Sequence, residues 1–196
     1  MKNSLRRWLG DAALVLIVAE LVLVLLSWLL SAMMTDGVRP LLSSEGIRWF
    51  FSHFTDWMAS PVLVWMLLLS MAGGSMARSG VLSRRTYRER YALRFALVLL
   101  LVYVVLVIVL TVSPHAVLLS ATGRLFPSPF SRALVPIVAF GVLLVAVTFG
   151  LVSGRFRSPS DVLSSLSYGV AWSAPLYVLY ILLLQFYESV HYVFSI

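Results

Sequence analysis

The sequence predicts an all-α integral membrane protein with about five transmembrane helices and a short interfacial helix near residues 45–57. Composition is the first reason, since 61% of the residues are hydrophobic, 12% are charged and the mean hydropathy is +0.97. A soluble domain has about 45–50% apolar and about 25% charged residues. The lengths of the apolar runs and the placement of the basic residues are the other two reasons. We expect a single membrane domain over residues 1–196, because no polar stretch is long enough to fold separately.

Each of the apolar runs is long enough to cross the membrane, because about 20 helical residues span a bilayer core of about 30 Å. The first run is too long for the apolar core of a signal peptide, which has about 7–15 residues. We therefore expect it to be a retained transmembrane helix. The expected spans cover residues 12–34, 58–77, 95–113, 133–153 and 162–187.

A polar stripe runs along the first expected span. Glu20, Ser27 and Ser31 are spaced i, i+7 and i+11, so they share one face of a helix. We expect this stripe to face other helices rather than lipid.

The segment after the first span has mixed character and predicts a helix at the outer membrane surface. Ser43 or Ser44 can cap a short helix that begins at Glu45. Its phenylalanines lie on one side, and its tryptophans are expected at headgroup level. The aromatic and apolar residues concerned are Ile47, Phe50, Phe51, Phe54, Trp49 and Trp57.

Small residues and one proline mark the second span. Pro61 lies in its first turn, where the missing N–H costs nothing. Gly73 and Gly74 permit either close helix packing or a break, and packing is the expected case. The third span is almost uniformly Leu and Val around Tyr103.

Breaking residues predict a loop over residues 114–132, which contains Gly123, Pro127 and Pro129. The fourth span follows, with Pro136 expected in its first turn.

A short basic turn over residues 154–160 precedes the fifth span, and Ser160 is the expected cap of that helix. Pro175 is expected to kink the fifth span near its centre. A polar face on this span predicts contact with other helices, and it consists of Ser173, Tyr177, Tyr180 and Tyr187.

Basic residues predict the orientation of the chain. The segment 78–94 contains six arginines and a single acid, Glu89. With the N-terminus in the cytoplasm, eleven basic residues fall on the inner side and four on the outer side. Lys and Arg near the ends of membrane helices are retained in the cytoplasm, so the N-terminus is expected inside and the C-terminus outside. This bias also argues for a bilayer rather than a nucleic acid as the partner of the arginines.

Enzyme signatures are missing from the sequence. It has no G-x-S-x-G, P-loop or H-E-x-x-H motif and no cysteine. His53, His115 and His191 lie in or near outer segments without the spacing of metal ligands. We expect no enzymatic activity and no cofactor.

Glu20 is the strongest candidate for chemistry within the membrane. It lies about eight residues inside the first expected span, which is about 12 Å deep at about 1.5 Å per residue. One interpretation is a proton or cation site, the usual role of an intramembrane acid. The other is a carboxyl group that only hydrogen bonds a neighbour. Polar residues expected at similar depth are Ser70, Tyr103, Thr148 and Ser173.

Several motifs resemble those of the p-aminobenzoyl-glutamate transporter (AbgT) family. In the C-terminal half these are LFPSPFSRALVPIVAF, FGLVSGRFRSPSDV and LLLQFYESV; in the N-terminal half they are LLSSEGIRWFFSHF and PVLVWMLLLSMAGGSMARSG. They occur in collinear order over most of the chain. The matching residues are Ser79, Gly80, Ser128, Pro129, Phe130, Gly150, Gly154, Ser158, Asp161, Val162, Gln185 and Phe186.

The resemblance implies a role in moving a small organic anion, such as p-aminobenzoyl-glutamate, across the inner (cytoplasmic) membrane. Family members are more than twice as long and hold their substrate in re-entrant hairpins, which have no counterpart here. Arg78 stands where the family usually has Glu. The resemblance therefore implies a shortened member that acts as a homo-oligomer or with another membrane protein. The alternative is a scaffold or accessory subunit that does not transport.

Overall fold

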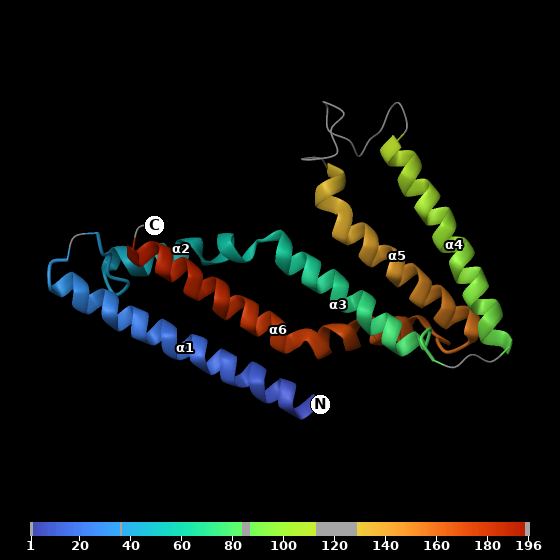
Figure 1. Ribbon diagram of the computed structural model, residues 1–196, viewed down its shortest axis with the longest axis horizontal. Coiled ribbons are helices and arrows are strands. Elements are labelled where there is room, and N and C mark those ends of the chain that lie inside the picture. Colours follow the sequence, from blue (N-terminus) through green and yellow to red (C-terminus); the bar gives the residue numbers. More distant parts are fainter. Residues whose placement is uncertain (1, 36, 84–86, 113–128, 195–196) are drawn as a thin grey trace. The chain divides into compact units, whose positions relative to one another are not determined.

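The computed structural model of the chain describes residues 2–35, 37–83, 87–112 and 129–194 (Figure 1). The fold is 87% helix, and the described residues contain no strand, which confirms the all-α prediction. The helices are α1 (Lys2–Ala32), α2 (Ser44–Met58), α3 (Pro61–Ser79), α4 (Tyr87–Val112), α5 (Pro129–Ser153) and α6 (Pro159–Phe194).

Five of these helices are long and apolar enough to cross a membrane, as predicted. They are α1, α3, α4, α5 and α6. The remaining helix, α2, is the short helix expected near residues 45–57. Its cap is Ser43, whose hydroxyl oxygen accepts a hydrogen bond from the backbone N–H of Gly46 at 2.9 Å.

Several helices extend beyond the apolar runs from which they were predicted. α1 begins at Lys2 instead of residue 12, α4 at Tyr87 instead of 95, and α6 ends at Phe194 instead of 187. Arginine, leucine and glutamate are good helix formers, so the backbone hydrogen bonds continue where the apolar composition ends. The arginine-rich segment 78–94 is therefore mostly helical, and α3 and α4 are separated only by residues 80–86.

The prolines test the predicted helix starts. Pro61 is the first residue of α3, as expected. Pro136 does not lie in a first turn, because α5 already begins at Pro129 and encloses it. Residues 129–132 are accordingly helical rather than part of a loop, while 114–128 lie outside the described residues. Pro175 lies inside α6, where the expected kink stays a prediction.

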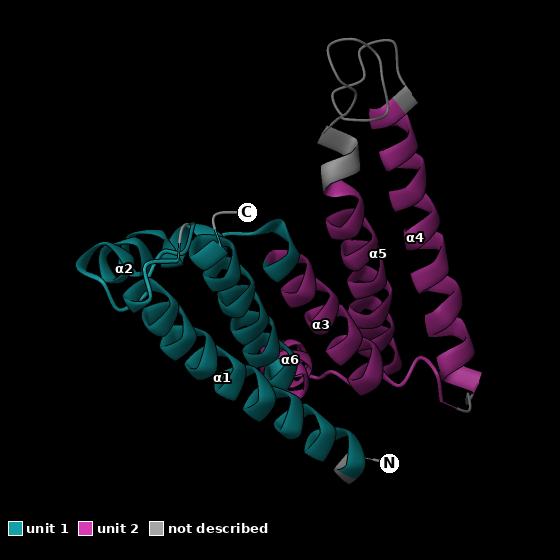
Figure 2. Ribbon diagram, turned by 60° about the vertical axis from the view of Figure 1, so that its left-hand side comes forward, with its two compact units in different colours: residues 1–63, 174–196 teal, residues 64–173 magenta. Residues whose placement is uncertain are grey.

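The chain divides into two compact units (Figure 2). Unit 1 contains Met1–Leu63 and Ala174–Ile196, and unit 2 contains Val64–Ser173. The boundaries fall inside α3 and inside α6, so each unit includes part of both helices. The expectation of a single membrane domain stays a prediction.

In unit 1, α1 lies alongside the C-terminal part of α6, and the two helices run in the same direction (Figure 1). Glu20 contacts Ser189, and one turn further along both helices Leu23 packs with Val193 in a buried apolar cluster. Parallel directions are those required of the first and the last of five spans.

Glu20 and Ser27 of the polar stripe of α1 face the protein, as predicted, whereas contact of Ser31 with other helices stays a prediction. The Ser27 side chain is fully buried, and its oxygen accepts a hydrogen bond from the backbone N–H of Leu41 at 3.2 Å. The segment that returns from α1 is held to α6 as well, because the N–H of Arg39 donates to the carbonyl oxygen of Val193 at 3.0 Å. Glu20 and Ser27 thus have hydrogen-bond partners within unit 1.

The aromatic residues expected at the membrane surface are partly used for packing. Trp49 of α2 is half-buried and stacks on Tyr192, with ring centroids 4.0 Å apart. Ile47 and Phe51 remain exposed on the same helix, which leaves α2 an apolar surface of the kind that rests on lipid.

The polar face predicted for the fifth span is also mostly used. Ser173 is buried, and the hydroxyl groups of Tyr180 and Ser60 are hydrogen bonded. Tyr177 is half-buried, whereas Tyr187 is 54% exposed and contacts only the His191 ring among the described ring pairs. Contact of Tyr187 with another helix stays a prediction.

In unit 2, α4 and α5 form an antiparallel pair through small and aromatic residues. Ala92 and Ala96 of α4 are fully buried and pack in one cluster with Val145 and Phe149 of α5. Their small side chains let the two helices approach closely. At the opposite end of the pair, the Tyr103 hydroxyl donates to the carbonyl oxygen of Ile137 at 3.0 Å.

The N-terminal part of α6 and α3 form the other antiparallel pair of unit 2. A Cβ atom on Gly74 would overlap the backbone of Gly169, so the two helices touch through their backbones. Next to this contact, the buried hydroxyls of Ser75 and Ser165 are 3.1 Å apart. A Cβ atom on Gly73 would have no neighbour within 4 Å, so Gly74 alone of the glycine pair provides the predicted close packing.

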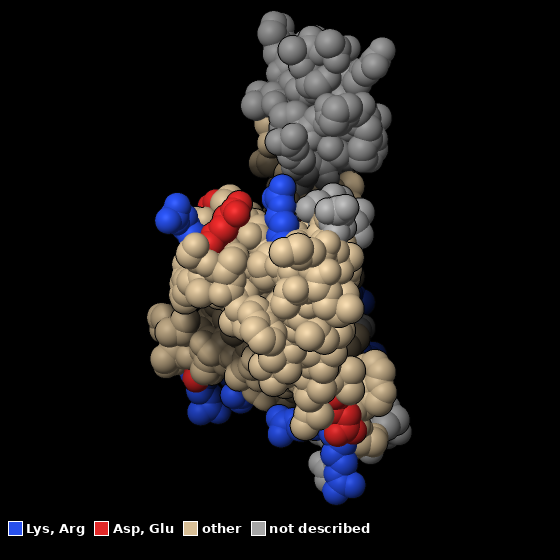
Figure 3. All heavy atoms as spheres, turned by 90° about the vertical axis from the view of Figure 1, so that its left-hand side faces the viewer, with Lys and Arg blue, Asp and Glu red and all other residues tan. Residues whose placement is uncertain are grey.

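The described surface is mainly apolar. On the face shown in Figure 3, uncharged side chains cover most of the protein and the charged ones gather in a few groups. Exposed large residues of α1 and α4 are leucine, valine and isoleucine in majority. This is the surface that a lipid solvent favours, since lipid chains are as apolar as these side chains.

Candidate functional site

A buried carboxyl group between α1 and α6 is the main candidate site of unit 1. The Ser189 hydroxyl donates to Glu20 Oε1 at 2.6 Å, and Gln185 Nε2 lies 3.5 Å from the same oxygen. Gln185 Nε2 also donates to the Ser189 oxygen at 3.2 Å. The distance from Ser189 lies at the short end of the range for hydroxyl–oxygen hydrogen bonds. The three side chains form a closed hydrogen-bonded triangle.

Two oxygens of this cluster have no hydrogen-bond partner. Glu20 Oε2 and Gln185 Oε1 are both buried, and neither has a donor within reach among the described residues. Buried polar groups are normally paired, so an unpaired acceptor requires an explanation. Here two unpaired acceptors belong to groups that already touch each other.

The cluster lies well inside the membrane-spanning part of α1. Glu20 is about 18 Å from the Ala32 end of that helix and about 24 Å from Ser4, at about 1.5 Å per residue. Leu23 and Val193 pack one turn beyond it and separate it from the end at which α2 lies. The carboxyl group therefore lies far from both ends of the α1 span.

Sequence analysis singled out Glu20 but not its partners. Gln185 was identified only as a motif residue, and Ser189 lies beyond residue 187, where the fifth span was expected to end. The spacing i, i+4 of Gln185 and Ser189 on one helix face was the available signal. It could not be connected with Glu20, because nothing in the sequence shows which two spans pack together.

The other polar residues expected at similar depth belong to unit 2, whereas Glu20 belongs to unit 1. The Ser70 hydroxyl donates to the carbonyl oxygen of Leu67 at 2.8 Å, within its own helix. Tyr103 bonds to α5, Ser173 is buried and Thr148 is half-buried. A common intramembrane site of these residues with Glu20 stays a prediction.

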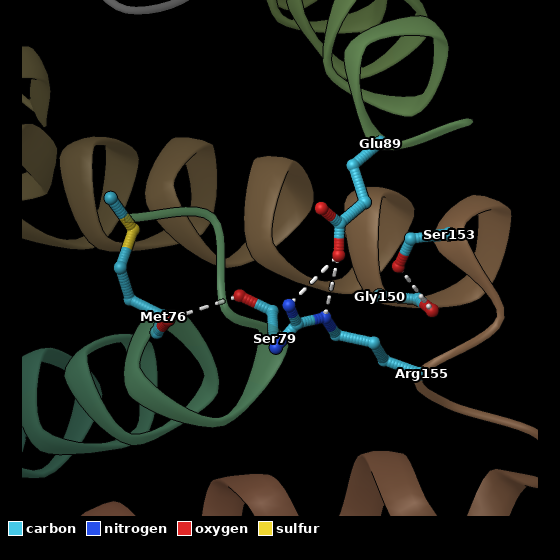
Figure 4. Close-up of polar contacts among 6 residues, drawn as sticks. All are labelled: Met76, Ser79, Glu89, Gly150, Ser153 and Arg155. Atoms are coloured by element: carbon cyan, nitrogen blue, oxygen red, sulfur yellow. Dashed lines mark hydrogen bonds and ion pairs between the residues drawn. The ribbon is translucent and has the colours of Figure 1, made fainter. Parts of the chain in front are cut away.

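The second cluster is the end of unit 2 at which four helices begin or end (Figure 4). Arg155, in the turn between α5 and α6, donates from Nη2 and Nε to Glu89 Oε1 of α4 at 2.8 and 3.3 Å. The Glu89 side chain is 15% exposed and that of Arg155 38% exposed. This ion pair ties the start of α4 to the turn that precedes α6.

Glycines allow this junction to form. Gly80 and Gly154 have positive φ angles of 73° and 80°, which end α3 and α5 in the left-handed conformation. A Cβ atom on Gly80 would overlap the Arg155 guanidinium group, so the arginine rests directly on the backbone. On Gly150 it would overlap the Phe156 ring. The motif glycines therefore make room for the two residues of the turn.

The start of α6 is capped by a reciprocal pair of side chains. The Asp161 carboxylate accepts hydrogen bonds from the N–H groups of Arg157 and Ser158 at 2.8 and 3.0 Å. The Ser158 oxygen accepts one from the N–H of Asp161 at 3.4 Å. The cap is thus Ser158 instead of Ser160, because α6 begins at Pro159.

Arg78, which departs from the family pattern, lies near the same junction. Its guanidinium carbon is 5.0 Å from the centre of the Tyr168 ring of α6, a cation–π distance. Within the described ranges, no group of three or more His, Cys, Asp and Glu side chains could hold a metal ion. The junction therefore holds the helix ends together by an ion pair, a cation–π contact and a helix cap.

Comparison with known proteins shows the family to which the chain belongs. The model of the AbgT transporter family matches residues 83–192, more than half of the chain. The chain belongs to the AbgT transporter family. No curated protein and no solved structure matches it.

The AbgT match begins at Ser83, inside the arginine-rich segment 78–94. Most of the motif residues with a structural role fall inside the match: Gly150, Gly154, Ser158 and Asp161 build the junction, and Gln185 bonds to Glu20. Ser79 and Gly80 precede it. Pro129 begins α5, and Ser128 lies outside the described residues. Membership in a transporter family argues for transport rather than enzyme catalysis.

Proposed function

We propose that this AbgT protein takes part in moving a small organic anion of the p-aminobenzoyl-glutamate type across the inner (cytoplasmic) membrane. Family membership over residues 83–192 carries the proposal. Five helices long and apolar enough to cross a membrane, and a carboxyl group buried between α1 and α6, support it, because ionisable groups inside a membrane usually serve a transport pathway.

We further propose that transport requires an assembly, either a homo-oligomer or a complex with another membrane protein. A transporter needs a midplane site, usually built from discontinuous helices. The glycine pair of α3 and Pro175 of α6 were the candidates for a break, yet both helices run through them without interruption. The elements for a substrate site are therefore expected at contacts with other subunits.

The polar stripes of α1 and α6 do not support the assembly. Glu20, Ser27 and Tyr180 all have hydrogen-bond partners within unit 1. The proposal of an assembly rests on the continuous helices instead.

A non-transporting scaffold or accessory subunit is the alternative. The same observation favours it, since continuous helices joined by tight contacts form a rigid frame without a moving element.

Uptake by reconstituted protein distinguishes these functions. The purified chain, sized by light scattering, is placed in liposomes that are given radiolabelled p-aminobenzoyl-glutamate. An assembly larger than one chain with uptake above protein-free liposomes, abolished by unlabelled substrate, is the expected result. Uptake by a monodisperse monomer would contradict the assembly. If no uptake occurs even when every co-purified partner is included in the liposomes, the scaffold is favoured.

The proposed orientation has a separate test. The chain has no native cysteine, so single cysteines report one position each. Thr35 and Ser83 are exposed and lie beyond the ends of α1 and α3. In intact cells an impermeant maleimide should label Thr35→Cys, and Ser83→Cys only after permeabilisation. The reverse pattern would show that the arginine-rich segment faces outward.

A further inference from the structure

We propose that Glu20, Gln185 and Ser189 form an intramembrane proton-binding site, in which one proton is bound and released at the Glu20 carboxylate. As the coupling site of a transporter this inference rests on the proposed function. As a proton site it rests on the geometry of unit 1 alone.

The hydrogen-bond inventory of the cluster lacks one donor. Glu20 Oε1 has the Ser189 hydroxyl and the Gln185 amide as donors, whereas Glu20 Oε2 and Gln185 Oε1 are buried and have no donor among the residues that the structure describes. A proton on the carboxylate converts one acceptor into a donor and supplies what is missing. An unpaired buried acceptor is unfavourable, so a hydrogen-bond donor at this place would stabilise the cluster.

Gln185 can serve both protonation states. Its Nε2 faces the carboxylate at 3.5 Å and donates toward it. When the terminal amide turns over, Oε1 occupies that position and can accept from the protonated carboxyl group. The Ser189 hydroxyl can rotate in the same way between donating and accepting, because it already does both, toward Glu20 and from Gln185. Both side chains can therefore present either a donor or an acceptor to the carboxyl group.

A metal cation fits this cluster less well than a proton. Hard cations such as Ca²⁺ take about six to eight oxygen ligands, whereas the cluster offers two unpaired oxygens. The elements packed in unit 1 carry further titratable or charged residues, none of which takes part in the hydrogen bonds of Glu20 described above: Arg6, Arg7 and Asp11 on α1, Glu45, Arg48, His53 and Asp56 on α2, Tyr177, Tyr180, Tyr187, Glu188, His191 and Tyr192 on α6, and Arg39 between α1 and α2. The groups that hydrogen bond to Glu20 itself are uncharged.

Chemical labelling of the full chain in liposomes tests the proposal without measuring transport. The hydrophobic reagent dicyclohexylcarbodiimide reacts with protonated carboxyl groups in apolar surroundings, and mass spectrometry locates the adduct. We expect an adduct on Glu20 whose yield falls as the pH rises. Glu20→Gln should lose that adduct, while Asp11→Asn, which removes an exposed acid of the same helix, should keep it.

Gln185→Met is the second variant, because it keeps the length of the side chain and removes its donor and acceptor. It should shift the pH at which labelling of Glu20 is half-maximal, and an unchanged profile would exclude the role of Gln185. Absence of an adduct on wild-type Glu20, or a yield independent of pH, would overturn the proposal even if a variant failed to fold. Protection by sodium at constant pH, but not by choline, would overturn the proton in favour of a cation.

Discussion

Helix α6 is packed in two different ways in the two units. In unit 1 it runs parallel to α1 and bonds to it through a carboxyl, an amide and a hydroxyl group. In unit 2 it runs antiparallel to α3 and touches it through glycine backbones and two serines. The first contact contains a carboxyl group that can change its charge, whereas the glycines and serines of the second cannot.

The difference shows how one membrane helix can combine rigidity with a responsive group. Lipid is as apolar as leucine, so helices associate in membranes through close van der Waals packing and interhelical hydrogen bonds. The glycine contact of unit 2 depends on steric fit and should not respond to pH. The polar contact of unit 1 depends on hydrogen-bond partners and should.

Gly169→Ala should have the largest effect on stability. Its Cβ atom would overlap the backbone carbonyl oxygen of Ser70, which cannot move without shifting α3. We expect a loss of about 1–3 kcal/mol, the usual cost of overpacking. Unfolding in detergent mixed with sodium dodecyl sulfate, followed by circular dichroism, measures this loss.

Gly73→Ala is the matched control for that contact. No atom lies within 4 Å of its Cβ position, so it should be neutral or should stabilise the helix by up to about 1 kcal/mol. Equal losses in both variants would show that the backbone contact between α3 and α6 is not the cause.

Ser189→Ala should have the second largest effect, because it leaves Glu20 Oε1 without its shortest hydrogen bond. We expect a loss of about 1–2 kcal/mol in the same unfolding measurement. Ser164→Ala removes an exposed hydroxyl of the same helix that bonds only to its own backbone, and should be neutral. In the double variant Glu20→Gln/Ser189→Ala, strictly additive losses would disprove the coupling of the two side chains.

Glu89→Gln should have the smallest effect. Its partner Arg155 is 38% exposed, so the ion pair is partly screened by solvent and contributes about 0–1 kcal/mol. The loss should shrink further in high salt. A loss that exceeds that of Ser189→Ala would mean that the junction of unit 2, and not the buried cluster of unit 1, is the more tightly coupled polar contact.

The predictions from sequence were right for elements and less accurate for their ends. Apolar runs identified all five candidate spans, because the cost of burying polar groups in lipid leaves a strong compositional signal. They missed the helical residues of 78–94 and misplaced Pro136 in a first turn, since the end of an apolar run is not the end of a hydrogen-bonded helix. The prediction of Ser160 as the cap of α6 was wrong for the same reason, because the helix already begins at Pro159.

The sequence by itself determined that the chain is an AbgT membrane protein, that it crosses the membrane as helices, and that Glu20 is its unusual intramembrane residue. Composition and motif order are properties of the amino-acid sequence, so they do not depend on which helices pack together. Only the tertiary structure decided that Glu20 meets Gln185 and Ser189, some 165 residues away. Which helices become neighbours depends on the steric fit of whole surfaces, and that fit is set by many small residues whose partners no local pattern specifies.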